Sequence, residues 1–273
     1  MFVDTHTHFY DEWLLPDAEA AVQRALEAGV GKMIQADVDS RERPAMWEIG
    51  NRHPGVIYQM LGLYPGSVDG NWREELEEVF HIAECLNDGP RSLAAREVPG
   101  IRTQAIVAIG EIGLDYHEGT EFAAEQKEVL RLQLELAAKL DLPVNFHLRD
   151  AWEDFFSVLA DASHLHLRGN LHCFTGSYEL YERANRYGDF SVGIGGVITF
   201  KNSHLAQTVE RIPMEKILLE TDAPYLAPVP YRGKRNESAF IPLIAQRLAE
   251  AKGLTLQEVE TLTTHNAETL FSL

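Results

Sequence analysis

The sequence predicts a (β/α)8 barrel, the TIM-barrel fold, as a single domain over residues 1–273. Short apolar segments alternate with amphipathic segments along the chain, and eight of the apolar segments have the composition of strands. The length of 273 residues is typical of this barrel and allows a sizeable core. A doubly wound open sheet is the alternative fold, but no GxGxxG motif follows an early strand.

The predicted strands are short, rich in β-branched or apolar residues, and bounded by Gly, Pro or polar turns. They cover residues 2–6, 31–36, 56–63, 105–111, 142–147, 169–174, 190–196 and 216–221. Helices are predicted between them, because apolar residues recur there at three- and four-residue spacing with charges on the other face. The clearest helical patterns lie at 17–29, 74–86, 125–140 and 151–162. Residues 87–104 are polar and contain Gly and Pro, so we expect a surface loop there.

The formal net charge of −18 limits the partners that this chain binds tightly. Such a charge opposes duplex binding through phosphate neutralisation, so a nucleic-acid substrate is expected to bind weakly and transiently. We see no secretory signal pattern, and no segment reaches the roughly 20 apolar residues of a membrane span. The two cysteines, Cys85 and Cys173, form no disulfide framework. We therefore expect a cytoplasmic monomer that does not interact with membranes.

Residue types that bind metals recur at the carboxyl ends of the predicted strands. His6 and His8 lie two positions apart, and the period of two in a strand points both imidazoles to the same side. In a parallel barrel all strand ends meet at one rim. One such residue alone is more often structural, but six fall at five strand ends: His6, His8, Glu111, His147, His172 and Asp222. Four imidazoles and two carboxylates predict that two divalent cations bind here. These ligand types do not distinguish Mg, Mn and Zn.

Five motifs resemble, in order and spacing, those of the TatD family of metal-dependent deoxyribonucleases, in the amidohydrolase-like superfamily. They are DTHTHF at 4–9, GEIGLDYH at 110–117, VNFHLRDA at 144–151, LHCFTGS at 171–177 and LETDAPYLAP at 219–228. The resemblance runs from residue 3 to residue 271. It implies two cation sites that share Glu111, the first completed by His6, His8 and Asp222, and the second by His147 and His172. It also implies 3′-to-5′ trimming of single-stranded DNA.

Two positions depart from the pattern of the family. The turn GLYPG at 62–66 has Tyr64 and Gly66 where the family usually has histidines, and Ser238 replaces a usual Pro. The resemblance implies that this turn helps to hold the substrate phosphate. Tyr64 is therefore a candidate substrate contact.

Positively charged side chains follow several predicted strands and are candidates for binding a substrate phosphate. They are Arg149, Lys201, Arg232, Lys234 and Arg235. Arg149 is the first of these, because its guanidinium can contact two phosphate oxygens. Trp152 and Tyr225 flank the predicted rim, and we expect them to pack rather than to stack on a base. Cys173 is expected to point away from the cations, because it alternates with His172 along the strand.

These observations predict a metal-dependent hydrolase that cleaves phosphodiester bonds with a water activated by two cations. Asp222 is the expected general base, and Glu111 is the second catalytic residue. Two alternatives stay open. The same site suits hydrolysis of another ester or of an amide, such as aminoacyl-tRNA deacylation, and a catalytically silent barrel scaffold is the alternative that is not an enzyme.

Overall fold

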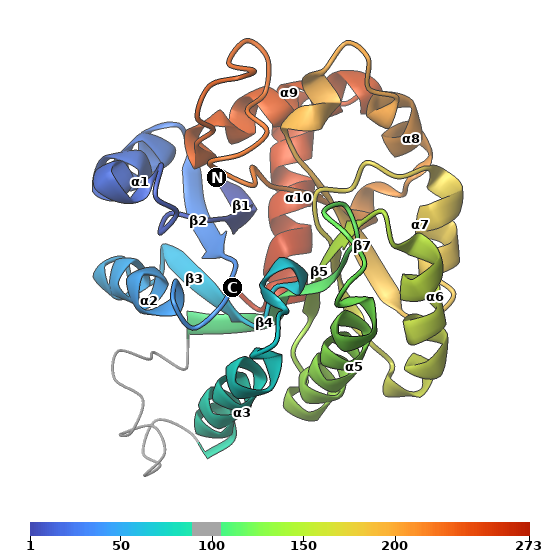
Figure 1. Ribbon diagram of the computed structural model, residues 1–273. Coiled ribbons are helices and arrows are strands. Elements are labelled where there is room, and N and C mark those ends of the chain that lie inside the picture. Colours follow the sequence, from blue (N-terminus) through green and yellow to red (C-terminus); the bar gives the residue numbers. More distant parts are fainter. Residues whose placement is uncertain (89–104) are drawn as a thin grey trace.

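The structure is a computed structural model that describes residues 1–88 and 105–273. Its eight parallel strands pair in chain order, and helices surround them (Figure 1). The strands are β1 (Phe2–Thr7), β2 (Val30–Gln35), β3 (Ile57–Leu61), β4 (Ile106–Asp115), β5 (Val144–Arg149), β6 (Arg168–Leu171), β7 (Asp189–Ile194) and β8 (Ile217–Leu219). A parallel bridge between Thr7 and Ala223 brings the chain after β8 back to β1. The sheet is thus a nearly closed barrel, as predicted.

Helices follow the strands and cover the outside of the barrel. They are α1 (Ala18–Glu27), α2 (Arg43–Arg52), α3 (Trp72–Asp88), α5 (Ala123–Leu140), α6 (Trp152–Asp161), α7 (Tyr178–Ala184), α8 (Leu205–Arg211), α9 (Ile241–Lys252) and α10 (Leu256–Phe271). Short 3-10 helices are η1 (Leu15–Asp17), η2 (Pro65–Ser67), η4 (Ser163–Leu165), η5 (Gly196–Thr199), η6 (Met214–Lys216) and η7 (Ser238–Phe240). Within the described ranges, no helix is both long and apolar enough to cross a membrane.

Several predicted boundaries differ from the structure. Strands β3, β6 and β8 are shorter than predicted, so His172 follows β6 instead of lying in it. Strand β4 was predicted to end at residue 111 but continues to Asp115, so Glu111 lies inside the strand and Asp115 ends it. The predicted surface loop at 87–104 starts too early, because positions 87 and 88 still belong to α3. The rest of that predicted loop, 89–104, lies outside the described residues.

The hydrophobic core leaves one end of the barrel for polar side chains. A cluster of apolar residues joins five strands to α10, and it includes Val3, Ile34, Met60, Ala108, Leu218 and Phe271. Helix α10 also packs on the start of β8, where Asn266 Nδ2 donates to the carbonyl oxygen of Ile217 at 2.9 Å. This packing covers the amino end of the barrel. Side chains at the opposite, carboxyl ends of the strands therefore face the region where barrel enzymes bind substrates.

Asp4 joins the two edges of the barrel with a buried carboxylate. Its Oδ1 accepts from the Thr221 amide at 2.9 Å, and its Oδ2 accepts from Thr221 Oγ1 at 2.6 Å. Backbone bonds continue the junction, since the Asp222 amide donates to the His6 carbonyl at 2.9 Å. The positions of His6 on β1 and of Asp222 after β8 are therefore fixed by the same contacts.

Replacing Asp4 with alanine tests the importance of this junction. Asp4→Ala leaves the buried Thr221 amide and hydroxyl without the acceptor that they share, so we expect a loss of about 2–4 kcal/mol in unfolding free energy. Chemical denaturation measures this loss, with the exposed Asp161→Ala as the control. Equal stability of the two variants would contradict the structural role of Asp4.

Candidate metal centre

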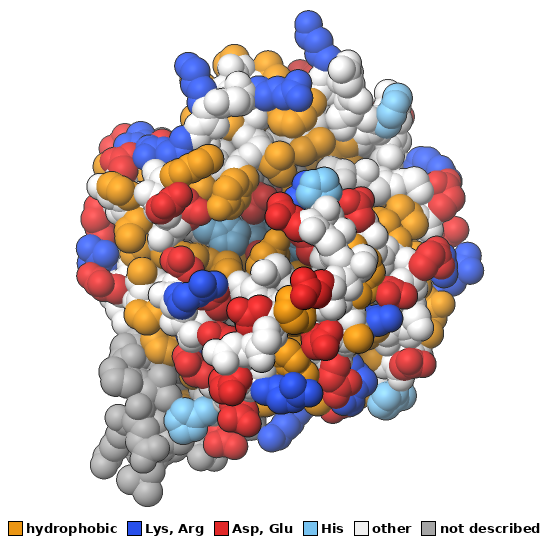
Figure 2. Space-filling view, viewed as in Figure 1, with side chains coloured by type: hydrophobic (Ala, Val, Ile, Leu, Met, Phe, Trp, Pro, Cys, Tyr) orange, Lys and Arg blue, Asp and Glu red, His pale blue; other side chains and the backbone are white. Residues whose placement is uncertain are grey.

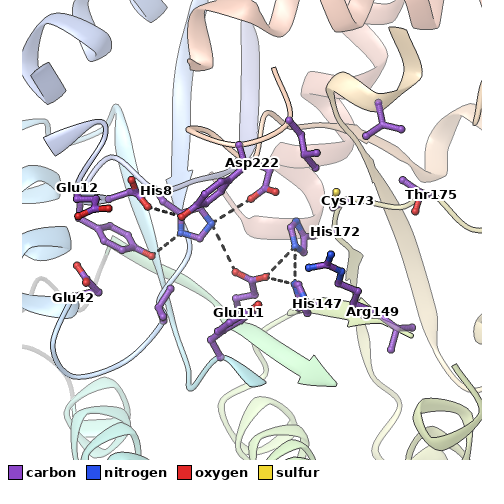
Figure 3. A pocket seen from close by; sticks show the side chains of 18 residues that line it. His8, Glu12, Glu42, Glu111, His147, Arg149, His172, Cys173, Thr175 and Asp222 are labelled. Atoms are coloured by element: carbon purple, nitrogen blue, oxygen red, sulfur yellow. Dashed lines mark hydrogen bonds and ion pairs between the residues drawn. The ribbon is translucent and has the colours of Figure 1, made fainter. Parts of the chain in front are cut away.

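The six side chains predicted as metal ligands lie together at the carboxyl end of the barrel. They come from five strands or from the residues that follow them: His6, His8, Glu111, His147, His172 and Asp222. All except the fully buried His6 line a cavity of about 810 Å³, a usual volume for a small-ligand site. Figure 2 shows histidine atoms at the bottom of a hollow, and Figure 3 shows five of these side chains pointing toward one another: His8, Glu111, His147, His172 and Asp222.

The first group consists of His6, His8 and Asp222. The Nε2 atoms of the two histidines are 3.0 Å apart. Asp222 Oδ1 lies 3.4 Å from His8 Nε2 and 3.8 Å from His6 Nε2. These three ligand atoms are close enough together to bind one cation.

The second group surrounds Glu111. Its Oε1 lies 2.7 Å from His147 Nδ1 and 3.0 Å from His172 Nε2. Its Oε2 lies 3.3 Å from His6 Nε2 and 3.8 Å from His8 Nε2. The two carboxylate oxygens of Glu111 therefore face two different pairs of imidazoles.

The protonation of the first pair of imidazoles fits a bound cation. His6 Nδ1 donates to Asn145 Oδ1 at 2.9 Å. The Tyr10 hydroxyl donates to the Ala36 carbonyl at 2.5 Å, so it accepts from His8 Nδ1 at 2.7 Å. Each Nε2 then carries a lone pair, because a neutral imidazole has one N–H. Two lone pairs 3.0 Å apart repel each other, and a divalent cation between them removes that repulsion.

The second pair of imidazoles is oriented by carboxylates behind it. His147 Nε2 donates to Asp115 Oδ2 at 2.8 Å, which leaves Nδ1 to face Glu111. His172 Nδ1 lies 3.4 Å from Glu220 Oε1, and its Nε2 faces Glu111. Carboxylates that hold the far nitrogen of a histidine are the usual support of a metal ligand. The donor set and its support both fit divalent cations.

Glu220 fits at this position because the neighbouring strand has a glycine beside it. A Cβ at Gly193 in β7 would lie 1.8 Å from Glu220 Oε2. Glu220 is fully buried and also accepts from the Cys173 amide and from Asn170 Nδ2. A larger residue at 193 would therefore displace the carboxylate that orients His172.

Sequence reasoning missed the residues that orient the ligands. Each lies two or four positions from a predicted ligand: Tyr10, Asp115, Asn145 and Glu220. That spacing was the available signal, because residues two positions apart in a strand share a face. Their roles still depend on contacts across the barrel, such as that of Asn145 with His6.

The ligand histidines and Glu111 strongly shift one another's pKa values. Burial raises the pKa of Glu111, but His172, His6 and hydrogen bonds from His147 outweigh it and hold that pKa well below its usual range. Burial lowers the pKa of His172, but Glu111 and Glu220 raise it well above its usual range. The pKa of His147 is also raised, since hydrogen bonds to carboxylates outweigh burial. Without a cation, the cluster therefore holds protons on these imidazoles.

Asp222 is a carboxylate that remains ionised in this position. Burial raises its pKa, but the neighbouring imidazoles of His8, His172 and His6 lower it below the usual value when they are protonated. The side chain lines the cavity, in contrast to His6 beneath it. It is thus placed both to bind a cation and to accept a proton from a molecule in the cavity.

Two of the predicted substrate contacts line the cavity, namely Arg149 and Tyr64. Arg149 ends β5 and is exposed. The Tyr64 hydroxyl donates to Asp115 Oδ2 at 3.3 Å, and its ring lies edge-on to His147 at a centroid distance of 4.9 Å. Burial raises the pKa of Tyr64, so its hydroxyl stays protonated and remains a hydrogen-bond donor.

The other predicted substrate contacts lie outside the cavity lining. Lys201, Arg232 and Lys234 are exposed, and the Arg232 guanidinium lies 4.5 Å from the ring centroid of Phe200. Arg235 forms ion pairs with two carboxylates, Asp17 at 2.6 Å and Glu237 at 2.7 Å. The structure therefore does not bring these four cations together with Arg149.

Two expectations about neighbouring residues are wrong. Cys173 lines the cavity instead of packing in the core, because β6 ends at Leu171 and the φ of 47° at Cys173 departs from strand geometry. Tyr225 is 44% exposed and also lines the cavity, so it is not packed as expected. Trp152 does pack, and its ring lies against Phe156 at a centroid distance of 5.6 Å.

Comparison with known proteins identifies the family. The family model described as "TatD related DNase" matches residues 3–272. The uncharacterised metal-dependent hydrolase YabD of Bacillus subtilis is 34% identical over the full length of both chains. The 3′-5′ ssDNA/RNA exonuclease TatD of Yersinia pseudotuberculosis is 33% identical over 94% of each chain.

The solved structures agree with this result. The TatD homologue YjjV from Escherichia coli K12 has a TM-score of 0.86 and 29% identity, covering 100% of this chain and 98% of that one. The alternative of a catalytically silent scaffold is set aside, because relatives along the whole chain are hydrolases by name. This chain belongs to the TatD family of metal-dependent hydrolases, which act on ester bonds.

Proposed function

We propose that this chain is a 3′-to-5′ exonuclease that cleaves single-stranded DNA with two divalent cations. The observation that carries the proposal is the position of Glu111, whose two oxygens each face a separate pair of imidazoles. A carboxylate between two sets of ligands is suited to a pair of cations that share it. The exonuclease from Yersinia pseudotuberculosis, 33% identical over 94% of each chain, supports the choice of substrate.

The residues of the cavity have distinct roles in this reaction. When bound, the cations supply positive charge that makes water a nucleophile at neutral pH and stabilises charge on the phosphoryl group. Asp222 accepts the proton of the attacking water, since its lowered pKa keeps it ionised. Arg149 binds a phosphate oxygen, and the Tyr64 hydroxyl turns from Asp115 to donate to a second one.

The binding of the strand is expected to be weak. Arg149 is the one Lys or Arg among the described residues that line the cavity. Three carboxylates that are not predicted ligands also line it: Asp11, Glu12 and Glu42. The protein therefore neutralises few phosphates, which agrees with transient rather than processive action.

The same three carboxylates favour a second candidate function. An acidic wall suits a substrate with an ammonium group, such as the aminoacyl ester of a tRNA end. The centre that we propose for phosphodiesters is equally suited to attack a carboxylic ester. Hydrolysis of aminoacyl esters without release of nucleotides from oligonucleotides would select this candidate.

The substitution Glu111→Ala tests the nuclease directly. We expect the metal-dependent release of nucleotides from a 5′-labelled single-stranded oligonucleotide to fall at least roughly 100-fold, because the carboxylate between the two ligand groups is lost. The measurement is a gel time course with Mg²⁺ or Mn²⁺, and with a chelator as the blank.

The control for this experiment is Glu118→Ala, an exposed carboxylate in the loop after β4. It should retain wild-type activity. The nuclease proposal fails if the folded wild type releases no nucleotides with either metal, or if Glu111→Ala is as active as the control.

The raised pKa values of His147 and His172 predict that metal binding depends on pH. A cation binds only the deprotonated nitrogen, so it displaces protons from these imidazoles. Affinity should therefore fall as pH drops from 8 to 6, by about tenfold per pH unit for each proton released. Calorimetric titration with Mn²⁺ in buffers of different ionisation enthalpy measures the number of protons that are released when the cation binds.

The exposed His117→Ala serves as the control for the pH experiment and should keep the wild-type profile, whereas His172→Ala should release fewer protons. An affinity that does not change between pH 6 and pH 8, with no dependence of the heat on the buffer, would refute this expectation.

A further inference from the structure

Two exposed aromatic side chains lie side by side at the mouth of the cavity. Trp13 is 58% exposed and Tyr225 is 44% exposed. Their ring centroids are 6.1 Å apart, with the planes inclined at 50°. Large aromatic faces open to water are suited to stack on a planar partner.

The carboxylate of Asp11 holds the Tyr225 ring through its hydroxyl and the Trp13 backbone through its amide. Its Oδ2 accepts from the Tyr225 hydroxyl at 2.6 Å, and its Oδ1 accepts from the Trp13 amide at 2.8 Å. Arg235 Nη1 also donates to the Trp13 carbonyl at 3.1 Å. The Tyr225 ring and the Trp13 backbone are therefore positioned before any ligand binds, which reduces the entropy lost on binding.

This pair lies next to the candidate metal centre. The Tyr225 ring is 6.3 Å from the ring of His8, and Tyr225 follows Asp222 by three positions. The Tyr225 amide donates to the Asp222 carbonyl at 2.8 Å, so the two residues share one turn. A planar group stacked on this pair is thus close to a phosphate at the metal centre.

The charges around the cavity are divided between two sides. Figure 3 shows Glu12 and Glu42 on one side of Glu111, and Arg149 on the other. Among the described residues, neither Glu12 nor Glu42 forms an ion pair with a Lys or Arg. Asp11, which holds the aromatic pair, lines the cavity together with them. Among the described residues that line the cavity, a phosphate on this side would meet carboxylates and no Lys or Arg.

We infer that Trp13 and Tyr225 form a binding site for the terminal nucleoside of a single strand. The base stacks on the aromatic pair, and the rest of the strand leaves past Arg149. Because a terminal nucleoside with a free 3′-hydroxyl carries no further phosphate, it avoids repulsion by Asp11, Glu12 and Glu42. The site therefore selects strand ends over internal positions. This inference rests on the proposed nuclease function and names the part of the substrate that the site recognises.

Three oligonucleotides that differ only at the 3′ end test the inference. One ends in deoxyadenosine with a free hydroxyl, one ends in an abasic sugar, and one carries a 3′-phosphate on the deoxyadenosine. Loss of base stacking in the Trp13→Ala variant should raise KM for the first by about 5- to 100-fold. Its KM for the abasic end should stay at the wild-type value. The Trp13→Phe variant should have a KM for the deoxyadenosine end that is close to that of the wild type.

The acidic side is tested with the 3′-phosphate end. Wild type should cleave it at least about tenfold more slowly than the hydroxyl end. The double variant Glu12→Gln with Glu42→Gln should reduce this difference, because it removes two negative charges and keeps the shape of the side chains. The controls for the aromatic pair are Leu15→Ala and Val229→Ala, at exposed apolar positions on the segments that carry Trp13 and Tyr225.

Trp13 fluorescence gives a readout that needs no catalysis. Titration of the strand that ends in deoxyadenosine into the Glu111→Ala variant should quench tryptophan emission. This quenching should be absent from the double variant that also carries Trp13→Phe. Equal KM values for the base and abasic ends in wild type, or a quench that persists without Trp13, would overturn the binding site. If the wild type releases no nucleotides, the proposed nuclease fails, and the fluorescence titration still decides whether Trp13 stacks on a base.

Discussion

The carboxylate of Glu111 is the group on which the candidate site depends. It is 4% exposed, and a buried carboxylate costs several kcal/mol unless charge or hydrogen bonds compensate for it. Here the compensation comes from imidazoles on both sides, and it is strong enough to hold the pKa of Glu111 well below its usual range. Because those imidazoles come from β1, β5 and the end of β6, the carboxylate draws together strands from across the barrel. The same arrangement that stabilises the carboxylate creates a place for cations.

The barrel holds this cluster through contacts that lie beneath it. Asp4 joins β1 to the chain after β8, and so fixes His6 relative to Asp222. Asn145 and Glu220 orient individual imidazoles from below. The substrate side is less constrained, since Trp13 and Tyr225 lie on segments after β1 and β8. In this fold, catalytic residues usually lie on the rigid strands, and the residues that determine substrate specificity usually lie on the surrounding loops.

The fold and the assembly of the ligands could be predicted from sequence because both follow from periodicity. Alternating apolar and amphipathic segments predict the barrel, and strand ends in a parallel barrel must meet, which brings residues as distant as His6 and Asp222 together. The cations Lys201 and Arg235 were predicted around the same rim, but a loop has no fixed period. Arg235 instead pairs with carboxylates of its own surroundings. The position of Cys173 depends on one backbone angle that strand alternation does not predict.

The net charge of −18 and the proposed nucleic-acid substrate are compatible if contact with the strand is short. The most direct test of the account is the position of cations in a crystal grown with Mn²⁺, located by anomalous scattering. If two cations share Glu111, two peaks about 3.5–4 Å apart are expected, with Glu111 contacting both. A single peak held by His6, His8 and Asp222, with Glu111 bound to no metal, would contradict it.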